Sequence, residues 1–234
     1  PHNPNYEYDL LSASLVPHAK YMAKAITEAT GWNVDIPAEI WPDGWDDYPP
    51  IFTPQFMMYF GTVGHTLEIK FADQSSIDAD LAACYASLEY ATEHKAQLMK
   101  NQFEIYNRGV QGMDVEKDVN FPYAYIIPVN EKQQKDVYQA YKMVQHMLNN
   151  GIVVQQAAQV FTAGSVSYPE GTFVVPMKQG LRGLVNTMLW EGEDVTQLAG
   201  SMYDISAYSF PLLNGFDAPA VTSPFQAETR NVTV

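Results

Sequence analysis

The sequence predicts an α/β protein built from two consecutive regions, and three observations support this. Periodic apolar residues predict long amphipathic helices in the first region, at 14–30 and 77–108. Short runs of β-branched and aromatic residues predict three strands in the second region, at 123–128, 151–154 and 172–176. A polar stretch at 113–120 separates the two regions, and 234 residues are enough for two ordinary domains.

The composition is that of a folded, acidic protein. Apolar residues make up 47% of the chain and aromatic residues 13%, which is typical of a globular domain. The net charge of −14 argues against a nucleic-acid partner and favours an acidic or exported protein. No apolar run of about 18 residues is present, so no membrane-spanning helix is predicted.

The first region is predicted to begin with a loop over 1–10, which is rich in Pro, Asn and Tyr. The helix at 14–30 follows, and Gly31 is its expected stop. An aromatic-rich loop over 32–55 comes next. A loop of this length is either functional, for example a lid, or a packed surface loop, and both interpretations stay open.

The segment from Gly61 to Phe71 places one carboxylate, Glu68, among strand-forming residues. Its apolar and β-branched side chains predict a buried strand. Because desolvating an unpaired carboxylate is costly, a glutamate there implies a metal, a cationic partner or a proton-transfer task. A structural ion pair between Glu68 and a buried Lys or Arg is the open alternative.

His65 stands three residues before Glu68, a spacing that zinc ligands use. On a helix the two side chains would share a face, whereas on a strand they point to opposite faces. The predicted strand therefore disfavours a metal ion held by both residues.

A long helix is predicted over 77–108, with Ser75 or Ser76 as its N-cap and Gly109 after its end. Cys84, the single cysteine, lies in this helix among alanines and is expected to be a small buried side chain. One cysteine allows no internal disulfide and no thiolate zinc site. The large apolar residues of the helix form a stripe at helical spacing: Leu81, Tyr85, Leu88, Leu98 and Ile105.

The second region has the spacing of a strand–helix–strand unit, with a strand at 123–128, a helix at 132–149 and a strand at 151–154. Such a unit favours a parallel sheet. A further strand at 172–176 and a short helix at 179–190 follow. This region contains no Gly-rich phosphate loop, nucleophile elbow or metal-spaced cluster.

Three motifs together resemble the C-terminal part of a zinc carboxypeptidase domain: Pro1-His-Asn-Pro-Asn-Tyr-Glu-Tyr-Asp9, Ile40-Trp-Pro-Asp-Gly44 and Gly61-Thr-Val-Gly-His-Thr-Leu-Glu-Ile69. The likeness is to large bacterial members of the carboxypeptidase A-like metallopeptidase family and covers residues 1–112. It implies the end of an α/β/α peptidase domain that hydrolyses a C-terminal peptide bond, and an extracellular or cell-surface location.

The resemblance also implies roles for individual residues. Glu68 matches the general base that acts on a zinc-bound water in that family, and Tyr48 is assigned to its mobile tyrosine. Trp41 and Trp45 are expected to contact the peptide substrate. The family's zinc ligands and substrate-binding arginines lie upstream of the matched region. The isolated chain is therefore expected to hold no catalytic zinc and to cleave nothing, and the upstream half of the domain is its expected partner.

The second region is similar to a glutamine-amidotransferase-like, flavodoxin-like α/β domain. The likeness covers 121–217, after a linker at 113–120 and before a truncated tail or next segment at 218–234. It contains no Cys nucleophile, so a packing or substrate-presenting role is expected. The motifs that carry it are Tyr168-Pro-Glu-Gly-Thr-Phe-Val-Val-Pro176, Gln179-Gly-Leu-Arg-Gly183 and Tyr203-Asp-Ile-Ser-Ala-Tyr208.

Three functions stay open. A metallocarboxypeptidase fragment predicts that Glu68 faces a cleft shared with Tyr48 and the loop carrying Trp41 and Trp45. A non-enzymatic module that grips a peptide or glycan with this aromatic loop predicts Glu68 paired with a cation and no cleft beside it. A hydrolase built on His65 and Glu68 needs both side chains on one face. Because the chain has no initiator methionine and no signal peptide, we expect both its ends to be cuts within a longer protein.

Overall fold

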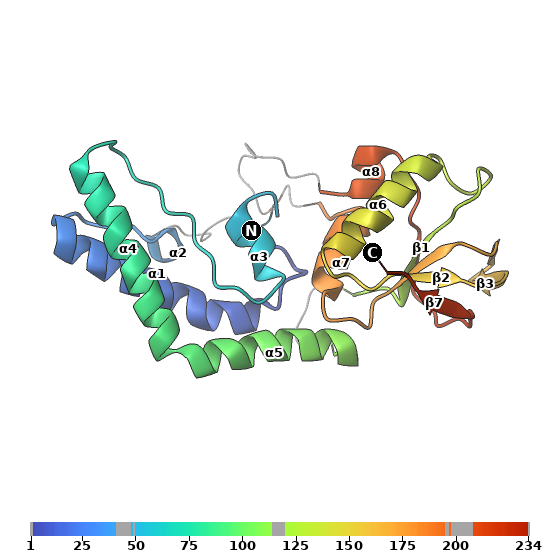
Figure 1. Ribbon diagram of the computed structural model, residues 1–234, viewed down its shortest axis with the longest axis horizontal. Coiled ribbons are helices and arrows are strands. Elements are labelled where there is room, and N and C mark those ends of the chain that lie inside the picture. Colours follow the sequence, from blue (N-terminus) through green and yellow to red (C-terminus); the bar gives the residue numbers. More distant parts are fainter. Residues whose placement is uncertain are drawn as a thin grey trace. The chain divides into compact units, whose positions relative to one another are not determined.

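The computed structural model describes residues 2–40, 48, 50–113, 120–194, 197 and 208–233 (Figure 1). The chain divides into two compact units, the first reaching Ile105 and the second beginning at Tyr106. Helices and antiparallel sheets are both present, which confirms the coarse expectation of an α/β protein. Most of the expected linker, residues 114–119, lies outside the described residues. None of the described helices is long and apolar enough to cross a membrane.

In the described part of the first unit, the ordered elements are all helices. They are α1 (Tyr8–Thr30), α2 (Pro37–Ile40), α3 (Thr53–Met58), α4 (Gln74–Glu93) and the first part of α5 (Lys95–Gln111). The predicted stop of α1 is confirmed, because Gly31 follows it with a φ of 74° and its N–H bonds to the Thr27 carbonyl. The helix begins six residues before the predicted start.

The single helix predicted over 77–108 is wrong, because α4 and α5 are separate helices that meet at His94. His94 has φ −104° and ψ 12°, outside the helical region. The predicted serine cap is also wrong, since Asp73 is the N-cap of α4 and its side chain accepts a hydrogen bond from the Ser76 N–H at 3.0 Å.

α4 packs against α1 through small side chains, and Figure 1 shows the two helices side by side. Ala79 and Ala83 form a buried cluster with Ile26 of α1. Such small residues allow two helix axes to approach closely. Cys84 is exposed, so its predicted burial is wrong. It lies about 100° around the helix from the buried Ala83, and its alanine neighbours do not reveal which face is buried.

The second unit contains a five-stranded sheet in the order β6-β1-β5-β2-β7 and a separate hairpin of β3 and β4. Its strands are β1 (Ala124–Ile127), β2 (Gln155–Ala157), β3 (Phe161–Ala163), β4 (Val166–Tyr168), β5 (Phe173–Pro176), β6 (Ala220–Val221) and β7 (Thr229–Asn231). Its helices, besides the end of α5, are α6 (Val137–Asn149), α7 (Arg182–Leu189) and α8 (Phe210–Asn214).

The predicted parallel sheet is wrong, because every pair of neighbouring strands in the five-stranded sheet is antiparallel. β1 and β2 are both antiparallel to β5, so they run in the same direction with β5 between them. A strand–helix–strand unit therefore exists in split form. Its second strand is β2 (Gln155–Ala157), so the strand predicted at 151–154 is wrong, because those residues have no strand structure. Local spacing shows that a helix joins two strands, but it does not show that a later strand is inserted between them.

The sheet is covered on both faces. One face packs against the β3–β4 hairpin in a buried cluster of Ala124, Ile126, Ala157, Phe161, Ala163, Tyr168 and Val174. The other face carries Tyr125, whose hydroxyl donates a 2.7 Å hydrogen bond to Asn186 of α7. On the same face, Phe173 meets the ring of Tyr141 from α6 edge-on, with centroids 5.4 Å apart. Burial on both faces explains why β1 reads as a continuous apolar run.

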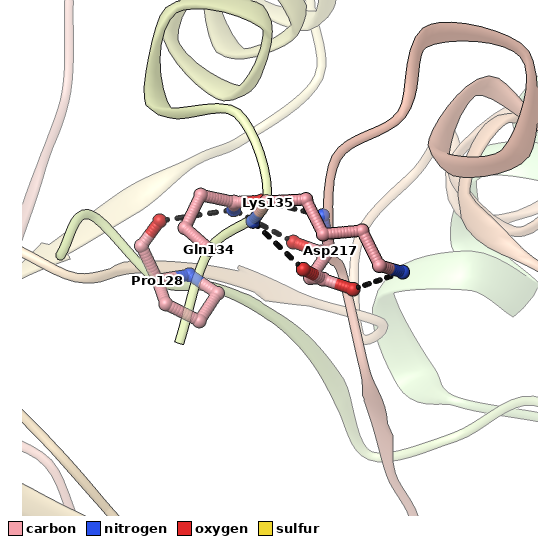
Figure 2. A network of polar contacts seen from close by, with 4 residues as sticks. All are labelled: Pro128, Gln134, Lys135 and Asp217. Atoms are coloured by element: carbon pink, nitrogen blue, oxygen red, sulfur yellow. Dashed lines mark hydrogen bonds and ion pairs between the residues drawn. The ribbon is translucent and has the colours of Figure 1, made fainter. Parts of the chain in front are cut away.

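A buried glutamine fixes the turn between β1 and α6 to the segment before β6 (Figure 2). The Gln134 amide donates to the carbonyls of Pro128 at 3.1 Å and Asp217 at 2.9 Å, and its oxygen accepts from the Asp217 N–H at 2.5 Å. Lys135 adds an exposed ion pair with the Asp217 carboxylate, with 2.7 Å between Nζ and Oδ1. One side chain thus satisfies three backbone groups that would otherwise be unpaired.

Candidate functional site

The first unit contains a cavity of about 300 Å³. Most of its wall is apolar, which is typical of a small-molecule or side-chain pocket. It is bounded by α1, the segment at 34–38, α3 and the segment at 64–67, with His2 completing the wall.

Two local features of the sequence, Pro54 and Gly64, help to position the segments that line the cavity. Pro54 lies in the first turn of α3, where its missing N–H is not needed. Gly64 then allows the returning chain to pass against α3, because a Cβ at this position would lie 2.9 Å from the Pro54 Cα. This close approach brings His65, Thr66 and Leu67 to the cavity.

Gln55 of α3 contributes a buried polar side chain to the cavity wall. Its side chain is only 4% exposed. Its Oε1 finds no hydrogen-bond partner among the described residues, although its main-chain carbonyl accepts a 2.9 Å bond from the Tyr6 hydroxyl. A buried amide oxygen without a partner at a cavity wall is suited to accept a hydrogen bond from a ligand or a bound water.

Three polar side chains form a hydrogen-bonded series that begins at His65 in the same wall. The Nε2 of His65 is 3.2 Å from the Nδ1 of His18, and the Nε2 of His18 is 2.9 Å from the Ser87 hydroxyl. The Tyr90 ring stacks on His18 with centroids 4.8 Å apart. Burial, followed by the nearby His18, lowers the pKa of His65 to about 4, and burial also lowers the pKa of His18. Both imidazoles are therefore neutral at pH 7.

The strand predicted around Glu68 is wrong. Residues 61–71 have no regular secondary structure, and Glu68 is exposed. A strand needs a neighbour for its backbone groups, and the described part of this unit offers none. The apolar residues of the segment instead pack on helices and rings: Ile69 joins the cluster of Ile26, Ala79 and Ala83, and Phe71 lies 6.3 Å from the Trp32 ring.

The position of Glu68 next to the lining segment keeps it a candidate functional residue. It directly follows the lining segment 64–67 but does not itself line the cavity. Among the described residues, Glu68 forms neither the ion pair with Lys or Arg nor any other contact that would mark it as structural.

Tyr48, the other predicted catalytic residue, is not brought to the cavity. Tyr48 is buried at 7% exposure, and its main-chain carbonyl accepts a 3.0 Å hydrogen bond from the Asn3 side chain. It is not among the residues that line the cavity. Trp41 and Trp45 lie outside the described residues.

The described residues do not fit a zinc site. No three His, Cys, Asp or Glu side chains gather closely enough there to hold a metal ion. His18 and His65 do meet, but each nitrogen at their contact faces the other imidazole, and the second nitrogen of His18 faces Ser87. A catalytic zinc needs three protein ligands and an open position.

No protein-family model, curated protein or solved structure matches this chain. The carboxypeptidase and amidotransferase likenesses are thus carried by the sequence motifs alone.

Sequence reasoning did not find Gln55, His18 or Ser87. Gln55 follows Pro54 in a helix that overlaps the end of the predicted loop over 32–55, and no local pattern marks its burial. His18 stands on the inner face of α1 and has the ordinary helical setting of a core histidine. Its partners are 47 and 69 residues away in the chain, so only the folded structure brings them together.

Proposed function

We propose that this chain supplies the general base and part of the substrate-binding cavity of a zinc metallocarboxypeptidase, with Glu68 as the base. The observation that carries the proposal is the position of Glu68: an exposed carboxylate without a cationic partner among the described residues, one residue beyond the cavity wall. The motif likeness around Glu68 supports the same role.

In this role the Glu68 carboxylate takes a proton from the water that attacks the C-terminal peptide carbonyl. The water oxygen forms the new bond to carbon, the C–N bond breaks, and Glu68 passes the proton to the departing amine. The apolar cavity would hold a side chain of the substrate, and the Gln55 oxygen would accept a hydrogen bond from it or from the peptide backbone.

The zinc of the proposed enzyme is assigned to ligands outside the described residues, because the described residues do not fit a zinc site. The proposal therefore makes the upstream half of the peptidase domain the partner of this chain. An extracellular or cell-surface location belongs to the same proposal. The proposed role of Tyr48 requires its ring to leave a buried position.

The amidotransferase-like fold of the second unit receives no support from its topology. A flavodoxin-like domain has a parallel sheet, whereas the sheet here is antiparallel throughout its described pairs. A packing or substrate-presenting role for this unit remains the proposal.

The test is Glu68→Gln in the full-length protein. We expect kcat for a peptide with a free C-terminus to fall by about 10²- to 10⁴-fold, the range of general-base catalysis, while the zinc content stays unchanged. Glu28→Gln, an exposed glutamate on α1, is the matched control and should retain full activity. Activity of Glu68→Gln within about tenfold of the parent would remove Glu68 from this role.

A non-enzymatic peptide-binding module is the second candidate, and the unpartnered oxygen of Gln55 favours it. Against it, a cavity lies beside Glu68, and the cation partner that this function predicts for Glu68 is not found among the described residues. This function predicts that the chain binds benzoylglycyl-phenylalanine, used as a probe, without hydrolysing it. Gln55→Met keeps the side-chain volume but removes the acceptor, and it should weaken binding about tenfold, whereas Glu68→Gln should leave binding unchanged. Isothermal calorimetry on the 234-residue chain measures both effects.

A further inference from the structure

Apolar residues occupy two opposite faces of α4. The alanines Ala79, Ala83 and Ala86 are buried on one face. The opposite face carries four large apolar side chains, Ile77, Leu81, Tyr85 and Leu88, which we name the outer stripe. Their exposed fractions are 61%, 55%, 63% and 66%. At about 100° per residue these four positions fall within about 80° of one another, so they form one continuous stripe.

A helix that is apolar on both faces is characteristic of an element packed between two layers. The first layer is α1, which meets the alanine face. None of the described residues covers the outer stripe, as the exposure of its four side chains shows. An exposed apolar surface of this continuity marks an interaction site.

The borders of the outer stripe are acidic. Asp78 and Glu89 lie on one side of it and Asp80 on the other, and all three are exposed. Their carboxylates form no ion pair with any residue that the structure describes. α4 contains no lysine or arginine that could offset them.

We propose that the outer stripe of α4 docks an amphipathic helix whose own apolar stripe is bordered by lysine and arginine. The partner's apolar residues would cover Leu81, Tyr85 and Leu88, and its cations would pair with the carboxylates at the borders. A second copy of this chain is disfavoured as the occupant, because it would bring the same acidic borders face to face in a protein of net charge −14. The inference does not depend on the proposed peptidase activity.

The probe is a fluorescein-labelled 18-residue helical peptide of leucine and lysine, with leucines on one face. Its control is a peptide with the same leucine pattern and glutamate in place of lysine. Fluorescence anisotropy with the 234-residue chain should show binding of the leucine–lysine peptide and at least tenfold weaker binding of the leucine–glutamate peptide.

Leu88→Asp is the decisive variant, with Leu212→Asp as its matched control, because both leucines are 66% exposed and both changes add one negative charge. A basic peptide held by charge alone would bind Leu88→Asp more tightly. Docking on the stripe predicts at least tenfold weaker binding to Leu88→Asp and unchanged binding to Leu212→Asp. Circular dichroism checks folding, and Leu88→Ser with Leu212→Ser repeats the comparison without added charge.

Three results would overturn the proposal. Equal binding of the two peptides would show that the acidic borders do not contribute to recognition. Equal effects of the substitutions at Leu88 and Leu212 would show that the peptide binds without the stripe. A dimer in sedimentation equilibrium that Leu88→Asp dissociates would make a second copy of the chain the occupant.

Discussion

His65 and His18 meet through their ring nitrogens, Nε2 to Nδ1 at 3.2 Å, and so join the segment after α3 to the middle of α1. His18 continues the contact to Ser87 of α4 at 2.9 Å. Three segments far apart in the sequence are thus held by one hydrogen-bonded chain behind the cavity. The contact between the rings requires at least one neutral imidazole to accept the hydrogen bond, since two imidazolium ions at this separation would repel each other.

This contact makes the stability of the first unit depend on pH. In the unfolded chain a histidine has a pKa near 6.5, whereas burial and the neighbouring His18 lower the pKa of His65 to about 4. Between these values the unfolded state binds a proton that the folded state does not. The stabilisation is therefore complete above about pH 6.5 and is lost as the pH falls towards 4, by about 2–3 kcal/mol.

Urea unfolding at pH 7 and pH 5, followed by tryptophan fluorescence, measures this loss, and NMR titration of the His65 ring measures the pKa directly. His65→Gln should make the unfolding free energy less dependent on pH. His146→Gln, an exposed histidine on α6, is the control and should leave the pH dependence unchanged. A His65 ring that titrates near 6.5 would contradict the prediction.

Ile26→Ala should destabilise the first unit by about 2–4 kcal/mol, because it leaves a cavity between α1 and α4. Ile26 is 3% exposed and contacts the alanine face of α4. Leu81→Ala, on the opposite face of α4 at 55% exposure, is the control and should change the unfolding free energy by less than about 0.5 kcal/mol. Similar losses of unfolding free energy for the two variants in urea would show that the alanine face is not the face of α4 that packs against α1.

Gln134→Leu should destabilise the second unit by about 2–4 kcal/mol, because it leaves the backbone groups of Pro128 and Asp217 without partners. Lys135→Ala removes only an ion pair whose lysine is 70% exposed, and it should cost less than about 1 kcal/mol. Thermal unfolding of both variants compares the two contributions. A larger effect of Lys135→Ala would show that the ion pair, and not the buried amide, fixes this turn.

Gly109→Ala should destabilise the second unit although alanine is the better helix former by about 1 kcal/mol. A Cβ at Gly109 would collide with the backbone carbonyl of Gln179, which cannot swing away as a flexible side chain does. We expect a net loss of about 1–3 kcal/mol. Val110→Ala, at the next and 54% exposed position, is the control and should be nearly neutral. A stabilised Gly109→Ala variant in urea unfolding would show that the two segments do not touch.

Two elements of the second unit, β1 and α6, were predictable because their signals are local. The apolar run that predicted a strand at 123–128 forms β1 (Ala124–Ile127), and the amphipathic pattern at 132–149 forms α6 (Val137–Asn149). The partner of each strand was not predictable, since β5 enters the sheet between β1 and β2 only after the intervening hairpin. Pairing is decided by contacts between residues distant in the sequence.

The segment around Glu68 shows the same limit more sharply. Its residues have strand propensity, but propensity is realised only when a neighbouring strand supplies hydrogen bonds, and the described part of the first unit has none. The large apolar stripe of α4 misleads for a related reason: a helical period shows that one face is apolar, but not that it is the face packed within this chain. Here the alanines pack and the large side chains stay exposed.

The sequence by itself determined the coarse α/β class, the end of α1 at Gly31 and the net charge of −14, because caps and periodicity depend on neighbouring residues and charge depends on composition. Only the tertiary structure decided the antiparallel order of the sheet, the meeting of His18, His65 and Ser87, and the burial of Gln55 beside the cavity. These features depend on which distant segments the burial of apolar surface brings together, and no local pattern encodes that choice.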